Sequence, residues 1–342
     1  MNETSAVLVT GGAGYIGSHV AWALHDAGRR AVVLDDLSAG RRELAPADAP
    51  FVEGDAGDIG LVARLARDHG CGAVMHFAGS IVVSESVAKP ELYFRNNTAV
   101  TGRLVEACLE AGIERFVYSS TAAVYGQPES VPIGEDTPLR PINPYGRSKL
   151  MSEWMLADAA AAHRFECVSL RYFNVAGADG RGRTGQVSPA ATHLIKIACE
   201  AALGRRDGVE IYGEDYDTPD GTCIRDYVHV DDVATAHLAA LDYLLAGGTP
   251  QVLNCGYGEG VSVRQVVNAV KRLAANNFPV TTVARRPGDP PVLVAHAERI
   301  GRLLKWTPRF TDLDLIVQSA LDWERRLESD PPGTPASAPI AD

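Results

Sequence analysis

The sequence has little positive charge and no long apolar segment, and each absence excludes a class of protein. Its 342 residues carry 32 Lys+Arg against 43 Asp+Glu, which gives a net charge of −11. No run of Lys and Arg appears, whereas a nucleic-acid-binding surface needs a basic patch. No apolar stretch reaches the ~20 residues that span a membrane. We therefore expect neither a nucleic-acid partner nor a membrane segment.

Closely spaced cysteines are also missing. None of the six cysteines forms a C-x-x-C pair, so we expect buried free thiols in a reducing compartment and no metal site. The chain enters an apolar run within a few residues of Met1, which indicates no signal peptide and a cytoplasmic protein. No internal repeat is visible.

Apolar strands alternate with helical segments in the first half of the chain. Short buried runs occupy 7–10, 31–34, 73–77, 115–119 and 167–172, and helical spacing is found at 15–27, 98–111 and 145–162. Strands that alternate with helices of this length are typical of βαβ units. The pattern predicts a Rossmann-like, doubly wound parallel sheet with right-handed crossovers.

The rhythm changes after Asn174, which suggests a second domain. Further helices are expected near 189–203, 230–246, 262–275, 296–304 and 312–327, and further strands at 251–254 and 280–283. We predict a first domain over 1–174, to which 228–256 return. A smaller, mixed α/β domain follows over 175–227 and 257–328. Residues 329–342 lack periodicity and are expected to form a disordered tail.

A glycine-rich turn joins the first strand to the first helix. Gly11, Gly14 and Gly17 would permit the turn, the approach of a pyrophosphate, and close packing of helix on strand. The free N–H groups of the helix N-terminus would then face the phosphates. Asp35 ends the second strand at the distance expected for an acid that accepts ribose hydroxyls. A plain turn beside a surface acid is the alternative, and the context favours a dinucleotide site.

The same acid selects the cofactor. A carboxylate at Asp35 would repel a 2′-phosphate, so NAD is expected in preference to NADP. Arg41 and Arg42 could argue for NADP, but they lie several residues beyond the end of the strand.

A tyrosine and a lysine stand at i and i+4 where a helix begins. Tyr145 and Lys149 would share one helix face. A free tyrosine is a poor base at neutral pH, and we expect the neighbouring ammonium and a bound nicotinamide to lower its pKa. Such a tyrosine can accept a hydroxyl proton while hydride leaves the same carbon. Thr121 ends a strand at the edge where ligands bind, and it can relay that proton.

Five segments in order carry a resemblance to a known family: Thr10–Gly17, His76–Gly79, Tyr145–Lys149, Arg171–Asn174 and Arg225–Val230. They resemble the extended short-chain dehydrogenase/reductase family over about residues 7–323. Within it, the chain is similar to the UDP-glucose 4-epimerase (UDP-galactose 4-epimerase) branch. The resemblance implies oxidation of the sugar at C4 by tightly held NAD, rotation of the 4-keto sugar, and return of hydride to its other face. UDP-glucose and UDP-galactose would be interconverted.

The resemblance also implies site residues. Tyr145, Lys149 and Thr121 would be catalytic. NAD would contact Gly11, Gly14, Tyr15, Ile16, Asp35, Asp36, Ser38, Asp55, Ala56, Phe77, Ala78, Gly79, Asn96, Ser119, Tyr145, Lys149 and Tyr172. The UDP-sugar would contact Thr121, Tyr145, Asn174, His193, Leu194, Tyr212, Arg225, Arg286, Asp289 and Leu293. Two arginines of that set, Arg225 and Arg286, can fork onto the diphosphate.

Three positions depart from the family pattern. Ile81 replaces a lysine near the cofactor, and His193 stands where asparagine is common. Leu293 occupies the position whose bulk is thought to gate N-acetylated sugars. Leucine is intermediate in size, so we expect a preference for UDP-glucose and UDP-galactose and weak activity on the N-acetyl forms.

Other functions remain open. A 4,6-dehydratase would need an acidic pair after Thr121, where Ala122 and Ala123 stand. A 4-epimerase acting on UDP-xylose/UDP-arabinose or on UDP-glucuronate is the closer alternative. A non-catalytic NAD sensor would be expected to lack Tyr145 or Lys149. The resemblance further implies a homodimer through a helix bundle that includes 98–111 and 145–162.

Overall fold

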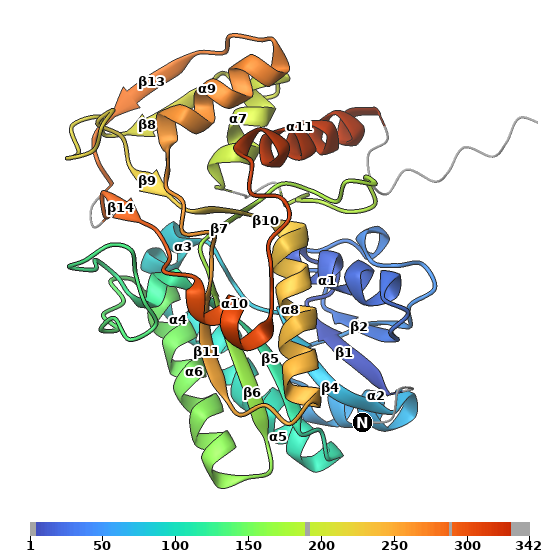
Figure 1. Ribbon diagram of the computed structural model, residues 1–342. Helices are drawn as coiled ribbons and strands as arrows, with labels where there is room; N and C mark the ends of the chain where they lie inside the picture. The colour runs from blue at the N-terminus through green and yellow to red at the C-terminus, as the bar shows by residue number, and fades with distance from the viewer. Residues whose placement is uncertain (1–4, 189–191, 287–288, 330–342) are drawn as a thin grey trace, which may run out of the picture.

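A parallel sheet of seven strands forms the centre of the part of the chain that the structure, a computed structural model, describes: residues 5–188, 192–286 and 289–329. The strand order is β11-β6-β5-β4-β1-β2-β3, and every neighbouring pair is parallel (Figure 1). This order confirms the predicted doubly wound sheet. The strands are β1 (Ala6–Thr10), β2 (Ala31–Asp35), β3 (Phe51–Glu53), β4 (Cys71–His76), β5 (Arg115–Thr121), β6 (Glu166–Tyr172) and β11 (Gln251–Cys255).

Helices cover both faces of this sheet. One face packs against α1 (Tyr15–Asp26), α8 (Val230–Leu245) and α10 (Glu298–Leu304), and the other against α2 (Ile59–His69), α5 (Val100–Ala111) and α6 (Pro144–Ala162). Because helices cover both faces, β1 and β2 are buried at every position. Short elements fill the connections: η1 (Arg42–Leu44), α3 (Val83–Ala88), α4 (Pro90–Tyr93), the π-helical η2 (Phe94–Ala99) and η3 (Ala122–Val124).

The carboxyl ends of the strands meet at one edge of the sheet. In the registers of the ladders, Thr10 pairs with His76 and Thr121 pairs with Tyr172. In open α/β sheets this edge is where ligands bind. A smaller part of the molecule lies over the same edge (Figure 1).

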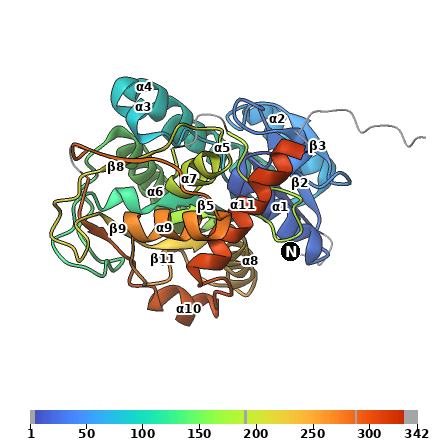
Figure 2. The same ribbon diagram turned by 90° about the horizontal axis from the view of Figure 1, so that it is seen from above.

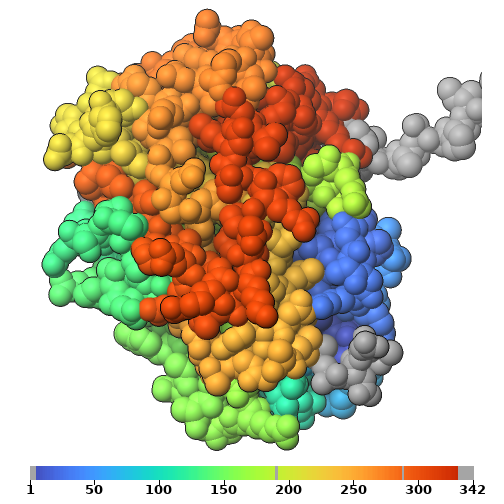
Figure 3. Space-filling model, in the orientation of Figure 1, coloured from blue at the N-terminus to red at the C-terminus, as the bar shows by residue number. Residues whose placement is uncertain are grey.

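That smaller part is a cluster of helices and short ladders. Its core packs α7 (Leu194–Ala202), α9 (Val263–Ala274) and α11 (Leu313–Ser329), which lie together when the molecule is seen from above (Figure 2). Its ladders are β8 (Val209–Tyr212) with β13 (Val280–Val283), β9 (Ile224–Arg225) with β12 (Val261–Ser262) and β14 (Val292–Leu293), and β7 (Asn174–Ala176) with β10 (Tyr227–His229). The last third of the chain, orange and red in Figure 3, spreads over both parts.

Several expected boundaries shift. The helix expected over 189–203 begins at Leu194, and residues 189–191 lie outside the described residues. The first residue of the expected tail, Ser329, is part of α11; residues 330–342 lie outside the described part. The sequence argument missed the β3 strand, the α2 helix and the two-residue strands. The strands are too short to show a clear period. α2 does bury Val62, Ala63, Leu65 and Ala66 at helical spacing, and this signal was overlooked.

Two findings concern chemistry elsewhere in the chain. All six cysteines are free thiols. Among the described residues, no helix combines the length and apolar character that crossing a bilayer requires.

Candidate active site

A single large cavity opens between the sheet edge and the smaller part, with a volume of about 1830 Å³. Pockets for one drug-sized ligand span roughly 300–1,000 Å³, so this cavity has room for two ligands side by side. It is lined by every site residue that the sequence analysis singled out, from Gly11 in the glycine turn to Leu293 in β14. The structure therefore brings the expected cofactor and substrate residues into one space.

The glycine turn has the geometry that a dinucleotide requires. A Cβ on Gly17 would lie 2.1 Å from the Gly11 carbonyl oxygen, so only glycine lets α1 approach the turn this closely. Gly11 itself has a φ of +70°. Gly14 is the N-cap of α1 and supplies no side-chain cap, which leaves the first N–H groups of the helix for a phosphate. The residues present thus fit the pyrophosphate of NAD.

Asp35 stands at the end of β2, where the ribose acceptor was expected. Its carboxylate accepts the N–H groups of Ala13 at 2.9 Å and Leu37 at 2.8 Å. Burial raises its pKa, and the Ala13 and Leu37 hydrogen bonds oppose that rise. Each oxygen keeps an acceptor position, so Asp35 both braces the glycine turn and can receive a ribose hydroxyl.

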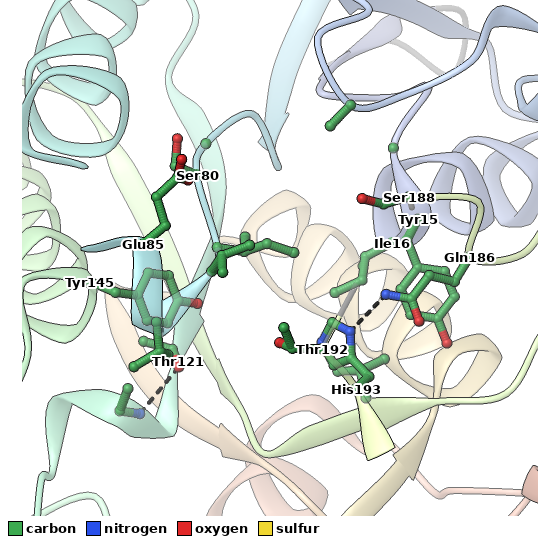
Figure 4. Close-up of a pocket in the computed structure, with 18 of the residues that line it drawn as sticks. Tyr15, Ile16, Ser80, Glu85, Thr121, Tyr145, Gln186, Ser188, Thr192 and His193 are labelled. Carbon is green, nitrogen blue, oxygen red and sulfur yellow. Dashed lines mark hydrogen bonds between the residues drawn. The ribbon is translucent and has the colours of Figure 1, made fainter. Parts of the chain in front are cut away.

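The start of α6 brings the catalytic candidates to the floor of the cavity. The Asn143 side chain caps the helix by accepting the Gly146 N–H at 2.8 Å, and Pro144 occupies the first turn. Tyr145 then projects from this first turn and lies beside Thr121 (Figure 4). The Thr121 hydroxyl also accepts the Ala123 N–H at 3.1 Å, which fixes its position at the end of β5.

Lys149 points from α6 toward the strand below it. Its ammonium donates to the Ser119 carbonyl at 2.8 Å and lies 4.8 Å from the centre of the Tyr118 ring. Burial lowers its pKa to about 8, while the carboxylate of Glu153 acts in the opposite direction.

The expected lowering of the Tyr145 pKa by Lys149 is wrong for the protein without ligands. Burial raises the pKa of Tyr145, and only its hydrogen bond with Thr121 opposes that effect. The ammonium of Lys149 donates to the Ser119 carbonyl, so its charge does not stabilise the phenolate form of Tyr145. Burial therefore favours the neutral, protonated phenol of Tyr145.

On the opposite side of the cavity, charged residues are paired with each other. Arg225 donates to the Asp289 carboxylate at 2.5 Å. The Arg286 guanidinium lies 3.7 Å from the centre of the Tyr212 ring. Leu293 pairs with Arg225 in the β14–β9 ladder, which places it next to the arginine expected to hold a phosphate.

His193 precedes α7 and is tied to the loop before it. Its Nδ1 is 2.7 Å from the Gln186 side-chain amide, and both residues gather with Tyr15 and Ile16 on one side of the cavity (Figure 4). Burial lowers the pKa of His193, and the charge of Lys196 lowers it further. The hydroxyl of Tyr15 donates to the Gly177 carbonyl at 2.7 Å, so this expected cofactor residue also joins the two parts of the molecule.

The sequence analysis missed some residues that shape the site. Asn97 holds the segment after Gly79, since its side chain accepts the Ser80 N–H at 2.8 Å and donates to the Ser148 hydroxyl at 2.9 Å. Its only sequence signal is its place beside Asn96. Glu85 lines the cavity near Tyr145, and nothing in its spacing marks it. Ile81, the replacement for lysine, also lines the cavity and is 52% exposed.

No metal-binding cluster accompanies this site. Within 5–188, 192–286 and 289–329, no three or more His, Cys, Asp or Glu side chains are grouped so that they could hold an ion.

Comparison with known proteins identifies the family. Residues 7–256 match the model of the NAD dependent epimerase/dehydratase family. A protein named UDP-glucose 4-epimerase from Azospirillum brasilense is 64% identical over 94% of this chain and 92% of its own length. The solved structure of UDP-glucose 4-epimerase from Brucella ovis in complex with NAD has a TM-score of 0.91 at 45% identity, covering 93% of this chain and 98% of that one.

A further solved structure is also similar to this chain. The UDP-Glc/GlcNAc 4-epimerase from Campylobacter jejuni is 48% identical, with a TM-score of 0.83, and the match covers 94% of this chain and 99% of that one. The family model, the relatives and the geometry of the cavity agree. The chain belongs to the NAD dependent epimerase/dehydratase family.

Proposed function

We propose that the chain interconverts UDP-glucose and UDP-galactose by transient oxidation at C4 of the sugar. The main support for this proposal is that one cavity is lined by three groups. They are the glycine turn with its uncapped N–H groups, Tyr145 beside Thr121, and the two arginines Arg225 and Arg286. A dinucleotide, a proton acceptor and a diphosphate site are what the reaction needs.

The cofactor half would hold NAD through groups already oriented for it. The N–H groups at the start of α1 face the pyrophosphate, and Asp35 receives ribose hydroxyls. Lys149 would donate to the nicotinamide ribose once its ammonium leaves the Ser119 carbonyl. When bound, NAD supplies a reversible acceptor for the hydride of C4.

Tyr145 would take the proton of the sugar 4-hydroxyl, with Thr121 holding that hydroxyl in line. Burial raises the pKa of Tyr145 in the free protein, so its phenol needs a positive charge nearby before it can act as a base. Lys149, 3% exposed, is the cation on the same helix face. On the return step, with the other face of C4 presented, Tyr145 would give the proton back to the O4 oxygen of the 4-keto sugar.

The substrate half would anchor the nucleotide while the sugar turns. Arg225 and Arg286 would grip the diphosphate, and Asp289 would accept hydroxyls of the uridine ribose. The side chains of His193, Leu194, Tyr212 and Asn174 complete this half of the cavity. Because the anchor is the nucleotide, the 4-keto sugar is free to present either face to the cofactor.

We further infer which segments of the chain bind each ligand. Residues 1–174 with 228–256 would bind NAD, and 175–227 with 257–328 would bind the UDP-sugar. Leu293 would crowd an N-acetyl group, which favours the unsubstituted hexoses. The chain would work as a homodimer through α5 and α6; Trp154 and Met151 on α6 are 57% and 40% exposed, which leaves an apolar surface for a second copy.

The test is to incubate purified protein with UDP-galactose, adding no cofactor, and to follow UDP-glucose by chromatography. Product without added NAD supports 4-epimerisation with retained cofactor. In Tyr145→Phe we expect kcat to fall by about 10²–10⁴ because the proton acceptor is lost, with NAD content unchanged. If wild type makes no product even with NAD supplied, the sugar assignment is wrong, and UDP-xylose/UDP-arabinose and UDP-glucuronate are the next substrates.

A further inference from the structure

A buried carboxylate outside the proposed mechanism lies on the helix face of the catalytic pair. Glu153 follows Lys149 by four residues, as Lys149 follows Tyr145, so the three side chains share one face of α6. The Glu153 side chain is 4% exposed. A buried charge is costly unless it is paired and hydrogen-bonded, and the partners of Glu153 are therefore informative.

Its partners sit next to residues that line the cavity. Arg171 on β6 holds the Glu153 carboxylate with two parallel hydrogen bonds, at 3.0 Å and 2.6 Å. The Ser120 hydroxyl on β5 donates to the same carboxylate. Ser120 directly precedes Thr121, and Arg171 directly precedes Tyr172. Glu153 thus fastens α6 to the two strands whose ends carry cavity residues.

The arginine of this pair is fixed from its other side. Arg171 also donates to the Tyr125 hydroxyl at 2.9 Å, and Tyr125 donates to the Asn254 side chain at 2.6 Å. Asn254 in turn donates to the Ile133 carbonyl at 2.8 Å. The network holds the Glu153 carboxylate in place, one turn of α6 beyond Lys149.

The surroundings of Lys149 explain why this position matters. From β4 it faces His76, whose pKa burial lowers to about 3, so the ring is neutral. From β5 it faces the Tyr118 ring, and Tyr145 precedes it by one turn of α6. Burial raises the pKa of both phenols, so they are neutral as well. Among the described residues around Lys149, Glu153 is the anion whose charge favours its ammonium form.

We propose that Glu153 is a positioning residue, which locks the Tyr145–Lys149 helix against β5 and β6 and whose negative charge keeps the buried Lys149 protonated. The proposal rests on the proposed function, because Lys149 acts there through Tyr145 and the nicotinamide ribose. The expected consequence is that activity at alkaline pH depends on Glu153.

The first test compares two buried glutamates. Glu153→Gln keeps the shape and removes the charge. Glu135→Gln is the matched control, since Glu135 is also 4% exposed and accepts the Asn254 N–H at 3.1 Å at the far end of the same network. We expect the alkaline limb of the kcat profile to move down by about one pH unit in Glu153→Gln, which is about a tenfold extra loss at high pH. The limb should not move in Glu135→Gln. An unmoved limb in Glu153→Gln, or an equal move in both, would overturn the proposal.

The second test measures the titration of the Lys149 ammonium directly, without following the reaction. The chain has five lysines, so ¹³Cε-lysine NMR gives few resonances. The resonance that disappears in Lys149→Met is assigned to Lys149. Its titration midpoint should lie below that of wild type in Glu153→Gln and should return in Glu153→Asp, which restores the charge. If Glu153→Gln does not fold, Glu153→Gln with Arg171→Met removes both buried charges, and the midpoint should again lie below wild type.

The outcomes separate the two proposals. A constant midpoint in these variants refutes the role of Glu153, whatever the activity. A lowered midpoint in a protein that does not epimerise UDP-galactose supports the role of Glu153 and refutes the assigned sugar.

Discussion

The two halves of the cavity differ in how their polar groups are held before a ligand binds. On the cofactor side, the glycine turn presents uncapped N–H groups, and Asp35 is braced by the backbone. On the substrate side, Arg225 pairs with Asp289, and Arg286 stacks on Tyr212. The glycine turn and Asp35 can accept their ligand without rearrangement, whereas the arginines of the substrate half, like Lys149, must first exchange partners.

This contrast has an energetic reason. Groups already in place lose little entropy when a ligand binds, which favours a cofactor that stays bound. Groups that are paired with each other give up one interaction to gain another, so the net free energy of binding is smaller. A substrate that must leave after every turnover benefits from weaker binding of this kind.

The strongest way to break the contrast is to disturb the cofactor half at Gly17. In Gly17→Ala the new Cβ would lie 2.1 Å from the Gly11 carbonyl oxygen, so backbone must shift. We expect protein purified without NAD and a destabilisation of about 1–3 kcal/mol from overpacking, measured by NAD content and by Tm. Gly134→Ala is the control, because no heavy atom lies within 4 Å of its Cβ position. Full NAD content in Gly17→Ala would mean that the turn is more compliant than its packing indicates.

A smaller effect is expected from the substrate half. Arg286→Ala should raise KM for UDP-galactose about ten- to hundredfold, because a charge-assisted hydrogen bond contributes about 1.5–3 kcal/mol. NAD content should not change, which separates the two halves. Arg285→Ala is the matched control: Arg285 pairs with Asp215 at 2.7 Å and is exposed. Similar KM values for the two variants would refute the diphosphate role of Arg286.

The smallest effect concerns the sugar. Leu293→Ala should raise kcat/KM for UDP-N-acetylglucosamine relative to UDP-glucose by about tenfold, since removing a few carbons from a pocket wall is worth about 1–3 kcal/mol. Leu315→Ala, at a 52% exposed position on α11, provides the control. Near-equal turnover of the two sugars by wild type would show that Leu293 does not act as the gate.

The cofactor half was also the more predictable half from sequence. Continuous runs of buried, valine-rich apolar residues identify β1 and β2, and the glycines between strand and helix identify the turn. These signals are local, because each comes from neighbouring residues. Most strands of the sheet and the glycine turn could therefore be located from sequence.

The substrate half depends on contacts between distant residues. Ile224 and Arg225 pair with Val292 and Leu293 in strands of two residues each, which are too short to show a period. The Arg225–Asp289 pair is equally invisible in sequence. The direction of the Tyr145 pKa was predicted wrongly for a related reason: burial dominates it, and burial depends on the packing of the whole chain around α6.

The last strand of the large sheet has a consequence for synthesis. β11 completes the edge beside β6, and α8 covers the face that holds α1, yet both follow the first segment of the smaller part in the chain. A nascent chain that has emerged only to residue 174 would expose the edge of β6 and an apolar sheet face. Exposed strand edges and apolar surface promote aggregation. Ribosome-bound chains that end before residue 251 should therefore bind a chaperone more strongly than chains that extend past Cys255.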